Sequence, residues 1–502
     1  MVDSSDMMMR ASRWAVLSVM VQISKAIVLF GSQIVLARLL SPSDFGIVAM
    51  CAPVFGFLAI FNDLGLSQAA IQKPDLTRRD SSLIFWINIG IALFIAALIV
   101  VIAPGAAAFY GDDRVTAVLI AMSSLVVINS LASQQVALMV RGMRQVPLLM
   151  IDILPVFGNV IVSISAALLG WGYWSIVIGQ ATHGVTANVI AWTMSDFRPS
   201  WPRMTPDARS MLRFGGHLTG LTLASFIATN LSPVLVGRLF GVVQVGLFDR
   251  AYKLVSMSYI QILTPISRIA ETLLARLVGD TARYRRVFLQ ITETMLLVAL
   301  PGLVCIAVQS EAAVELLYGP RWIASSPLVT WFALGSLMTP LGTAASWLFI
   351  TQGRTAPMLK FGLVSHAISV VSLLVGLPWG TVGVACSFAV FSIPSQGLTI
   401  WAATRHGAVS LRDFATMLVP IAIAVAASAA AVYAVSVTVH RFDNYPALEF
   451  SAGIVVAYTA TVLALGCFGS GRRVLRDAAR VREAFGSRRA DQTKPLPQPP
   501  LL

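Results

Sequence analysis

Charged side chains inside long apolar stretches are the residues of this sequence that could do chemistry. Lys25 lies in an apolar stretch over 14–38, and Arg268 lies in another over 252–275. At about 1.5 Å per helical residue, Lys25 would lie roughly 16 Å deep in a membrane. A charge at that depth costs several kcal/mol, so each such residue is a functional candidate. Two dispersed cations at low dielectric suit an anionic ligand, because charge-assisted hydrogen bonds are strongest there.

Polar residues share the helix faces of these cations. Helical spacing puts on the Lys25 face Ser18, Gln22 and Ser32. That face lines either a water-filled cavity or a buried polar neighbour, and both readings stay open. The Arg268 face also carries Gln261, Thr264 and Glu271. Arg268 could bind a ligand or pair with Glu271 at i, i+3.

Acidic residues could balance or couple these cations. Asp63 lies in a stretch over 46–70, with Ser67 one turn further on, and we expect it to bind a coupling proton or Na⁺ or to neutralise Lys25. Glu271 is a second candidate for charge balance. Asp152 lies nearer a predicted helix end and is expected at the membrane interface. The four cysteines lack metal-ligand spacing, so we predict no metal and no cofactor beyond a coupling ion.

Two arginines recur at a constant offset. Arg38 in "IVLARLLSPSDFGIVAM" matches Arg238 in "VLVGRLFGVVQVGLFDR", and Gly46 matches Gly246. Each arginine lies at a predicted outer helix end, where it could reach headgroups and helix C-terminal carbonyls. The alternative is an outer gate in which Arg38 and Arg238 pair with acids such as Asp44 and Asp249.

Long helices must position these residues. The 502 residues are 57% hydrophobic and only 12% charged, which indicates an integral membrane protein. Apolar stretches long enough to span a bilayer predict fourteen helices. We place them at 14–38, 46–70, 83–105, 115–140, 147–170, 173–195, 214–237, 252–275, 287–309, 325–350, 357–378, 381–403, 415–437 and 449–469.

The distribution of basic residues predicts the orientation. Of the 36 Lys and Arg residues, 27 fall in the termini and loops of one side and seven fall in the loops of the other. The positive-inside rule therefore places both termini in the cytoplasm. The net charge of +13 describes a cytoplasmic face beside anionic membrane lipid, so no nucleic acid is expected as a partner.

The repeat predicts two parallel six-helix bundles, because six helices separate its copies and the chain returns to the same side between them. The predicted parts are a cytoplasmic N-terminus (1–13), an N-terminal bundle (14–195), a basic linker (196–213), a C-terminal bundle (214–403), an extra helix pair (404–469) and a basic, Pro-rich tail (470–502). A cleft between two such bundles is typical of a transporter.

The strings "LARLLSPSDFGIVAM", "FNDLGLSQAAIQKPDLT" and "AFYGDDRV" resemble the polysaccharide transporter family of the multidrug/oligosaccharidyl-lipid/polysaccharide (MOP) superfamily. The resemblance covers essentially the whole chain. It implies a Wzx-like flippase that moves undecaprenyl-pyrophosphate-linked oligosaccharide across the bacterial inner membrane by alternating access. It also implies pyrophosphate contacts from the first and eighth helices, which carry Lys25 and Arg268, and suggests a polysaccharide polymerase and chain-length proteins as partners.

Two other functions stay open. The sequence has no Walker A, HExxH or nucleophile-elbow pattern, so we expect no enzyme. A membrane polysaccharide polymerase would need larger outer loops. A cation-coupled multidrug exporter of the same superfamily would place acids and aromatic residues deepest, whereas here the deepest charges are basic.

Overall fold

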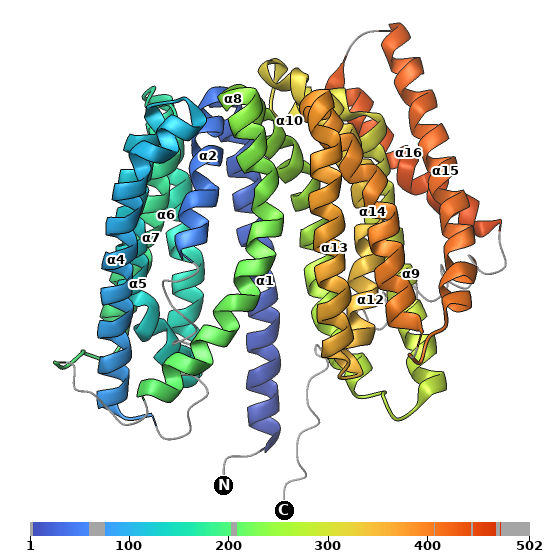
Figure 1. Cartoon of the computed structure of the whole chain (residues 1–502). Coiled ribbons are helices and arrows are strands. Elements are labelled where there is room, and N and C mark those ends of the chain that lie inside the picture. Colours follow the sequence, from blue (N-terminus) through green and yellow to red (C-terminus); the bar gives the residue numbers. More distant parts are fainter. Residues whose placement is uncertain are drawn as a thin grey trace, which may run out of the picture. The chain divides into compact units, whose positions relative to one another are not determined.

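The computed structural model describes the backbone of residues 4–59, 76–201, 208–405, 407–442, 445–467 and 472, and the side chains of most of them. Within these ranges every regular element is a helix, so the predicted all-helical fold class is confirmed (Figure 1). Asp63 and nearly all of the predicted tail over 470–502 lie outside the described residues.

The described helices divide between two compact units. The first unit comprises Met1–Ala251 and Leu317–Ser325, and the second comprises Tyr252–Leu316 and Ser326–Leu502. The helices of the first unit are α1 (Ser4–Leu39), α2 (Pro42–Ala59), α4 (Arg78–Tyr110), α5 (Arg114–Arg141), α6 (Gln145–Leu168), α7 (Trp174–Met194) and most of α8 (Ala208–Ala275).

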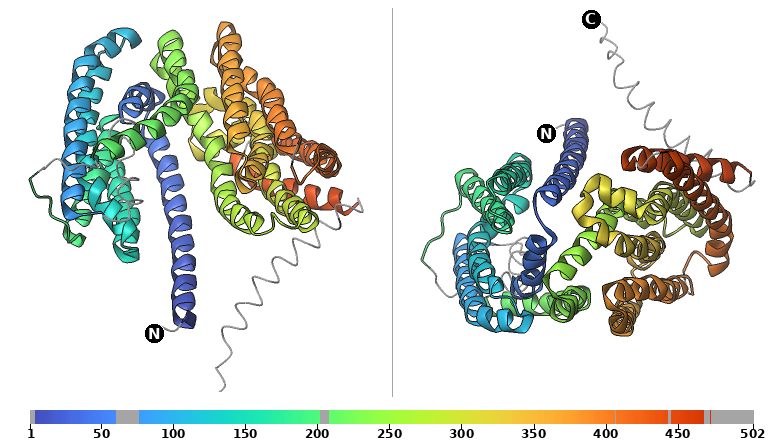
Figure 2. Two further views of the ribbon diagram at one scale, coloured as in Figure 1. Left: turned by 60° about the horizontal axis from the view of Figure 1, so that its bottom comes forward. Right: turned by 90° about the horizontal axis from the view of Figure 1, so that it is seen from above.

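The second unit continues from the end of α8. Its helices are α9 (Thr281–Val308), α10 (Ser310–Leu317), α11 (Ser326–Ser336), α12 (Thr339–Thr351), α13 (Thr355–Gly376), α14 (Gly380–Thr404), α15 (Leu411–Phe442) and α16 (Pro446–Gly466). The short 3₁₀ helix η2 (Leu377–Trp379) precedes α14, and η1 (Pro320–Ser325) belongs to the first unit. The long helices within each unit run side by side (Figure 2).

Each of the fourteen predicted spans is helical over most of its described length, with two differences. The span over 325–350 is broken between α11 and α12, where Pro340 stands in the first turn of α12, a position that needs no backbone N–H. The spans over 214–237 and 252–275 are joined by further helix, interrupted at Gly241 with φ 84° and ψ 178°. Glycine adopts that backbone conformation without steric cost.

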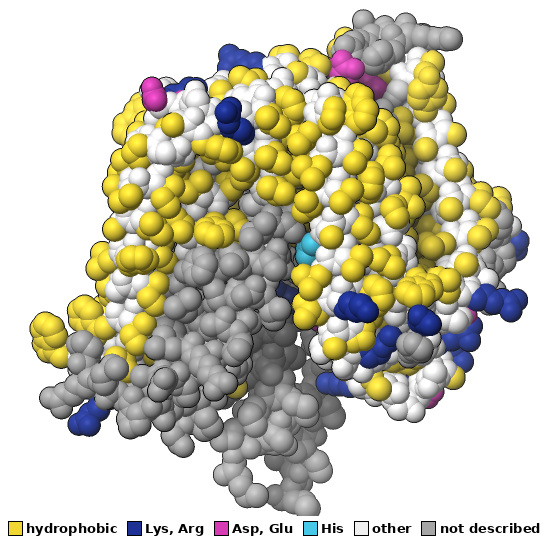
Figure 3. Space-filling view, in the orientation of Figure 1, with side chains coloured by type: hydrophobic (Ala, Val, Ile, Leu, Met, Phe, Trp, Pro, Cys, Tyr) yellow, Lys and Arg dark blue, Asp and Glu magenta, His cyan; other side chains and the backbone are white. Residues whose placement is uncertain are grey.

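The helices suit a membrane. Nine of the described helical segments are long and apolar enough to cross a bilayer by length and composition. In each unit, hydrophobic side chains cover the middle of the face drawn in Figure 3, and Lys and Arg gather towards helix ends. The chain is therefore a multi-pass membrane protein.

Packing within each unit sets which faces meet. In the first unit α4 packs along α5, α6 along α7, and α1 against α6. In the second unit α13 packs along α14, and the extra pair α15 and α16 packs on α9. The predicted domain boundary at 196–213 follows the repeat, whereas the compact units divide after Ala251, within α8. At Gly46 and Gly246, α8 lies close against α2. The repeat-based division stays a prediction.

Candidate functional site

Lys25 is paired with a carboxylate of the first unit. Because α1 packs against α6, the Lys25 Nζ lies 3.6 Å from the Asp152 Oδ1. The two side chains are 27% and 47% exposed, so a polar ligand can reach both. His183 of α7 lies within electrostatic range of Lys25. The cluster therefore combines an accessible cation, a carboxylate and an imidazole.

The sequence missed this partner. Asp152 was expected at the membrane interface, and Asp63, the acid chosen to balance Lys25, lies outside the described residues. Helical spacing gives the face of a residue but not the helix which that face meets. The contact of α1 with α6 joins helices far apart in the sequence, so no local signal predicted it.

The predicted polar stripe on α1 changes character along the helix. Gln22 is exposed and Lys25 is half-buried, whereas Ser32 is 6% exposed. The Ser32 hydroxyl donates to the Leu29 carbonyl at 2.8 Å within the same helix. The side chain of Ser18 is outside the described residues. The accessible part of the stripe is therefore centred on Gln22 and Lys25.

Arg268 and Glu271 lie on α8 within the second unit. The Arg268 side chain is exposed and Glu271 is half-buried. Within the part of the chain that the structure describes, no ion pair joins these two residues, although they are spaced for one. The guanidinium of Arg268 is therefore not neutralised by the nearest acid of its own helix.

The predicted gate residues each have a definite position in the first unit. The Arg38 Nε donates to the Leu317 carbonyl at 3.3 Å. The Arg238 guanidinium lies over the Phe109 ring, 5.6 Å from its centroid. Asp249 forms an ion pair with its neighbour Arg250 at 2.8 Å. The pairing of Arg38 and Arg238 with acids stays a prediction.

Asp44 caps a helix. The Ser41 backbone N–H donates to the Asp44 carboxylate at 2.9 Å, and the Asp44 N–H donates to the Ser41 hydroxyl at 3.2 Å. This reciprocal pair is a capping box, with Pro42 in the first turn of α2. The other carboxylate oxygen of Asp44 accepts from the Tyr173 N–H at 3.0 Å. The sequence signal was the Ser-x-x-Asp spacing in "SPSD".

Arg250 is a buried residue that sequence reasoning counted among loop cations. It is 4% exposed, and its ion pair with Asp249 is supplemented by a hydrogen bond to the Gln33 amide oxygen. Its guanidinium also lies 4.3 Å from the centroid of the Phe45 ring. Arg250 therefore ties the last part of α8 in this unit to α1 and α2.

The repeated glycines lie at one contact. A Cβ added at Gly46 would lie 2.8 Å from the carbonyl carbon of Val242, and one added at Gly246 would lie 3.0 Å from the Gly46 nitrogen. Backbones approach this closely only where side chains are absent. Each copy of the repeated motif thus supplies a glycine to the contact between α2 and α8, which we call the glycine contact.

The segment Leu317–Ser325 covers the end of α1 beside this contact. The Trp322 indole is fully buried, donates to the Ala37 carbonyl at 2.7 Å and meets the Phe45 ring edge-on. Tyr318 packs against Trp322, and burial raises the pKa of its hydroxyl to about 12. Since Phe45 also contacts Arg250, the segment and the glycine contact share one aromatic core.

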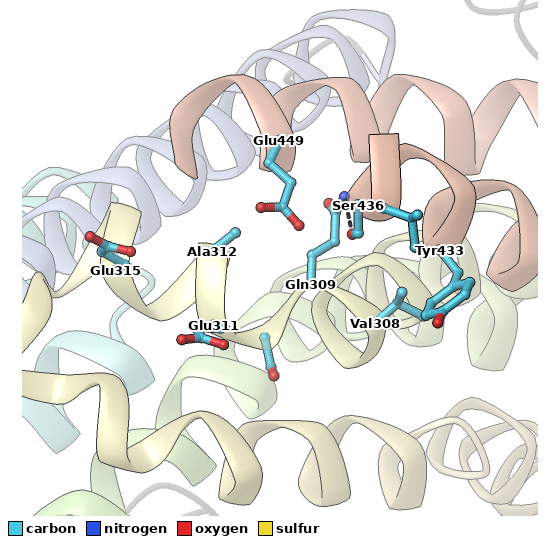
Figure 4. A pocket seen from close by; sticks show the side chains of 10 residues that line it. Val308, Gln309, Glu311, Ala312, Glu315, Tyr433, Ser436 and Glu449 are labelled. Atoms are coloured by element: carbon cyan, nitrogen blue, oxygen red, sulfur yellow. Dashed lines mark hydrogen bonds between the residues drawn. The ribbon is translucent and has the colours of Figure 1, made fainter. Parts of the chain in front are cut away.

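A pocket of about 450 Å³ lies in the second unit, where α9 and α10 meet α15 and α16. Its lining includes Glu311, Glu315, Tyr433 and Glu449. The Glu449 carboxylate points from α16 towards the space beside Ala312 and Gln309, and the Gln309 amide donates to the Ser436 hydroxyl at 3.0 Å (Figure 4). The carboxylates suit sugar hydroxyls or cations and would repel a pyrophosphate.

The described residues hold no group of three His, Cys, Asp or Glu able to bind a metal ion, and the absence of a metal stays a prediction. The four cysteines are free thiols. Cys51 and Cys305 are buried, whereas Cys467 is exposed at the end of α16.

Comparisons with known proteins show the family to which the chain belongs. A family model described as polysaccharide biosynthesis protein matches residues 35–327. The teichuronic acid biosynthesis protein TuaB of Bacillus subtilis is 24% identical over 346 residues, which cover 64% of this chain and 69% of TuaB. The lipopolysaccharide biosynthesis protein WzxC of Escherichia coli is 20% identical over 390 residues, which cover 76% of this chain and 78% of WzxC.

Solved structures share the fold. The lipid II flippase MurJ, in an inward closed conformation, is similar with a TM-score of 0.72 at 12% identity, covering 89% of this chain and 98% of MurJ. An inward-facing multidrug resistance MATE family transporter of the MOP superfamily is similar with a TM-score of 0.58 at 15% identity, covering 77% of this chain and 98% of that protein. At such identities the likeness concerns the fold alone.

Proposed function

We propose that this chain, which belongs to the polysaccharide biosynthesis protein family, is a flippase for undecaprenyl-pyrophosphate-linked oligosaccharide. It moves repeat units of a surface polysaccharide, such as O-antigen, capsule or exopolysaccharide, across the bacterial inner membrane. The relatives named for teichuronic acid and lipopolysaccharide biosynthesis support a surface glycan as the end product.

The accessible ion pair of Lys25 carries this proposal. Lys25 keeps a charge inside an apolar helix bundle, yet it is partly exposed and its carboxylate neighbour lies 3.6 Å away. A charge at membrane depth is retained where it has a function. We assign Lys25 to the substrate pyrophosphate. Arg268 of the second unit, which is exposed and not paired with Glu271, is assigned to the same anion at another stage of transport.

Alternating access would use the glycine contact as the outer gate. Closure there relies on backbone approach at Gly46 and Gly246 and on Arg250 beneath the Phe45 ring. Opening would separate α2 from α8, and with them the two copies of the repeated motif. Both termini face the cytoplasm in this proposal. The energy comes from a proton or Na⁺ gradient, from the substrate concentration or from partner enzymes. A polymerase and chain-length proteins would use the exported units.

The rival function is cation-coupled drug export. The MATE likeness shares only the fold, and an exporter of cationic drugs would need net negative charge at its deepest position. Lys25, half-buried on α1, favours an anionic substrate instead. Membrane polysaccharide polymerisation is the weaker rival, because the described segments between helices are short.

Gene deletion with complementation tests the function. Deletion in the host should cause undecaprenyl-pyrophosphate-linked repeat units to accumulate and surface polysaccharide to fall. Wild type should restore export, and Lys25→Ala should not, although it inserts normally. Lys360→Ala, which removes an exposed lysine of α13, is the matched control and should restore export. Unchanged glycan and no accumulation, with redundant exporters deleted, would refute the flippase and favour drug export.

A further inference from the structure

We infer that Asp152 is an internal substitute for the substrate's phosphate, which pairs with Lys25 when the site is empty and competes with the bound lipid so that it can leave. This inference rests on the proposed function, in which Lys25 binds the pyrophosphate. It assigns to Asp152 a positioning role in substrate release.

The geometry of the pair is that of a replaceable contact. A charge-assisted hydrogen bond between an ammonium and a carboxylate is about 2.7–2.9 Å long, whereas Lys25 and Asp152 are 3.6 Å apart. Both side chains are partly exposed, and pairs of that kind contribute little because solvent screens them. A ligand can therefore replace the Asp152 carboxylate beside Lys25 at a small cost in free energy.

Another pair of the same unit shows the contrast. Arg250 and Asp249 lie 2.8 Å apart, with side chains only 5% and 18% exposed. Removing either partner there would leave a charge buried without its counter-ion. Asp152 is 47% exposed, so the protein does not enclose its carboxylate when Lys25 turns to a phosphate. The first pair suits exchange with a ligand, whereas the second is a buried pair of adjacent residues on α8.

Release is the step that needs such a residue. A pyrophosphate carries more negative charge than a carboxylate and would displace Asp152 when it enters. Without a competing carboxylate, no group of the protein would take the place of the phosphate on Lys25, so the anion would stay bound longer. A carboxylate anchored on α6 is always present at high local concentration and can retake Lys25 each time the phosphate shifts.

Binding of undecaprenyl pyrophosphate to the purified full-length protein in nanodiscs tests the inference. Asp152→Asn keeps the side-chain shape and removes the competing charge. Because an exposed ion pair contributes only a small free energy, the affinity for the lipid should rise about two- to fivefold. The lipid's dissociation rate should fall by a similar factor, and export in cells should slow. Asp152→Glu keeps the charge and should bind as wild type.

Matched variants separate the possible failures. Asp196→Asn removes an acid from another exposed ion pair of the same unit, with Arg144, and should leave affinity unchanged. In a Lys25→Gln background, which itself binds weakly, Asp152→Asn should have no further effect. Equal or weaker binding by Asp152→Asn, while Lys25→Gln binds weakly, would overturn this inference and leave the proposed function standing. Unchanged binding by Lys25→Gln would instead remove Lys25 from the proposed site.

Discussion

Substituting Gly46 by alanine should open the glycine contact. The added Cβ would lie 2.8 Å from the carbonyl carbon of Val242 and nearer still to its oxygen, whereas ordinary contact begins at about 3.4 Å. The obstacle is backbone, which cannot turn aside as a side chain can. The two helices must therefore separate by at least about 0.6 Å at this point, and neighbouring contacts must follow.

The energetic cost can be estimated from packing. Adding a methyl group to a filled contact typically costs about 1–3 kcal/mol. If that cost falls on the closed state alone, the ratio of closed to open forms falls about 5- to 150-fold. The separation would also draw Phe45 away from Arg250 and Trp322, which both contact its ring.

Thiol labelling measures the opening. Ala49 lies one turn beyond Gly46 on α2 and is 5% exposed, so Ala49→Cys serves as the reporter after the four native cysteines are replaced. A membrane-impermeant maleimide should label it at least fivefold faster in Gly46→Ala than in the parent. Gly31→Ala on α1 is the matched control, because its added Cβ meets no atom within 4 Å.

Equal labelling of the reporter in Gly46→Ala and Gly31→Ala would refute the reasoning. It would mean that the contact relaxes locally without opening, or that it does not form a gate. Slower labelling would also contradict the account, because a larger residue could then stabilise the closed form.

Three further outcomes are expected. Arg250→Lys keeps the charge but loses the planar stack on Phe45, so reporter labelling should rise as in Gly46→Ala; an unchanged rate would exclude a role in closure. Trp322→Phe loses the bond to the Ala37 carbonyl and should lower thermal stability by about 1 kcal/mol, unlike Trp379→Phe at an exposed site. The hydrogen bond from Arg114 lowers the pKa of Asp112, so the stability difference from Asp112→Asn should be full well above pH 3.8 and disappear as the pH falls below it; a pH-independent difference would contradict this.

Sequence reasoning recovered the helices because apolar length and Pro or Gly breaks are local signals. It also found the repeat, and in the structure the repeated Gly46 and Gly246 meet at one contact. The helical character of residues between the predicted spans in α8 was missed. Charged residues and glycines there suggested a loop, whereas the chain stays helical apart from Gly241.

Partners of charged residues were harder to predict than their helices. Lys25 was identified from its depth, but its neighbour Asp152 depends on which helix faces α1. Arg250 was counted as a loop residue because it lies between the predicted spans over 214–237 and 252–275, although tertiary packing buries it against Phe45. Asp44 was considered only for the outer gate, although the local Ser-x-x-Asp pattern indicates the helix cap that the structure shows. Pairing between charged residues far apart in the sequence depends on tertiary contacts, which a single sequence does not reveal.

Flipping by the purified protein tests the central claim most directly. Proteoliposomes would carry a fluorescent undecaprenyl-pyrophosphate-linked oligosaccharide on both leaflets, and an impermeant glycosidase added outside would digest the accessible fraction. With wild type, nearly all the lipid should be digested, at a rate that rises with the amount of reconstituted protein. With Lys25→Ala, digestion should stop once the lipid of the outer leaflet, about half of the total, is consumed. Digestion that stops at that half with active, correctly folded wild type would contradict the account.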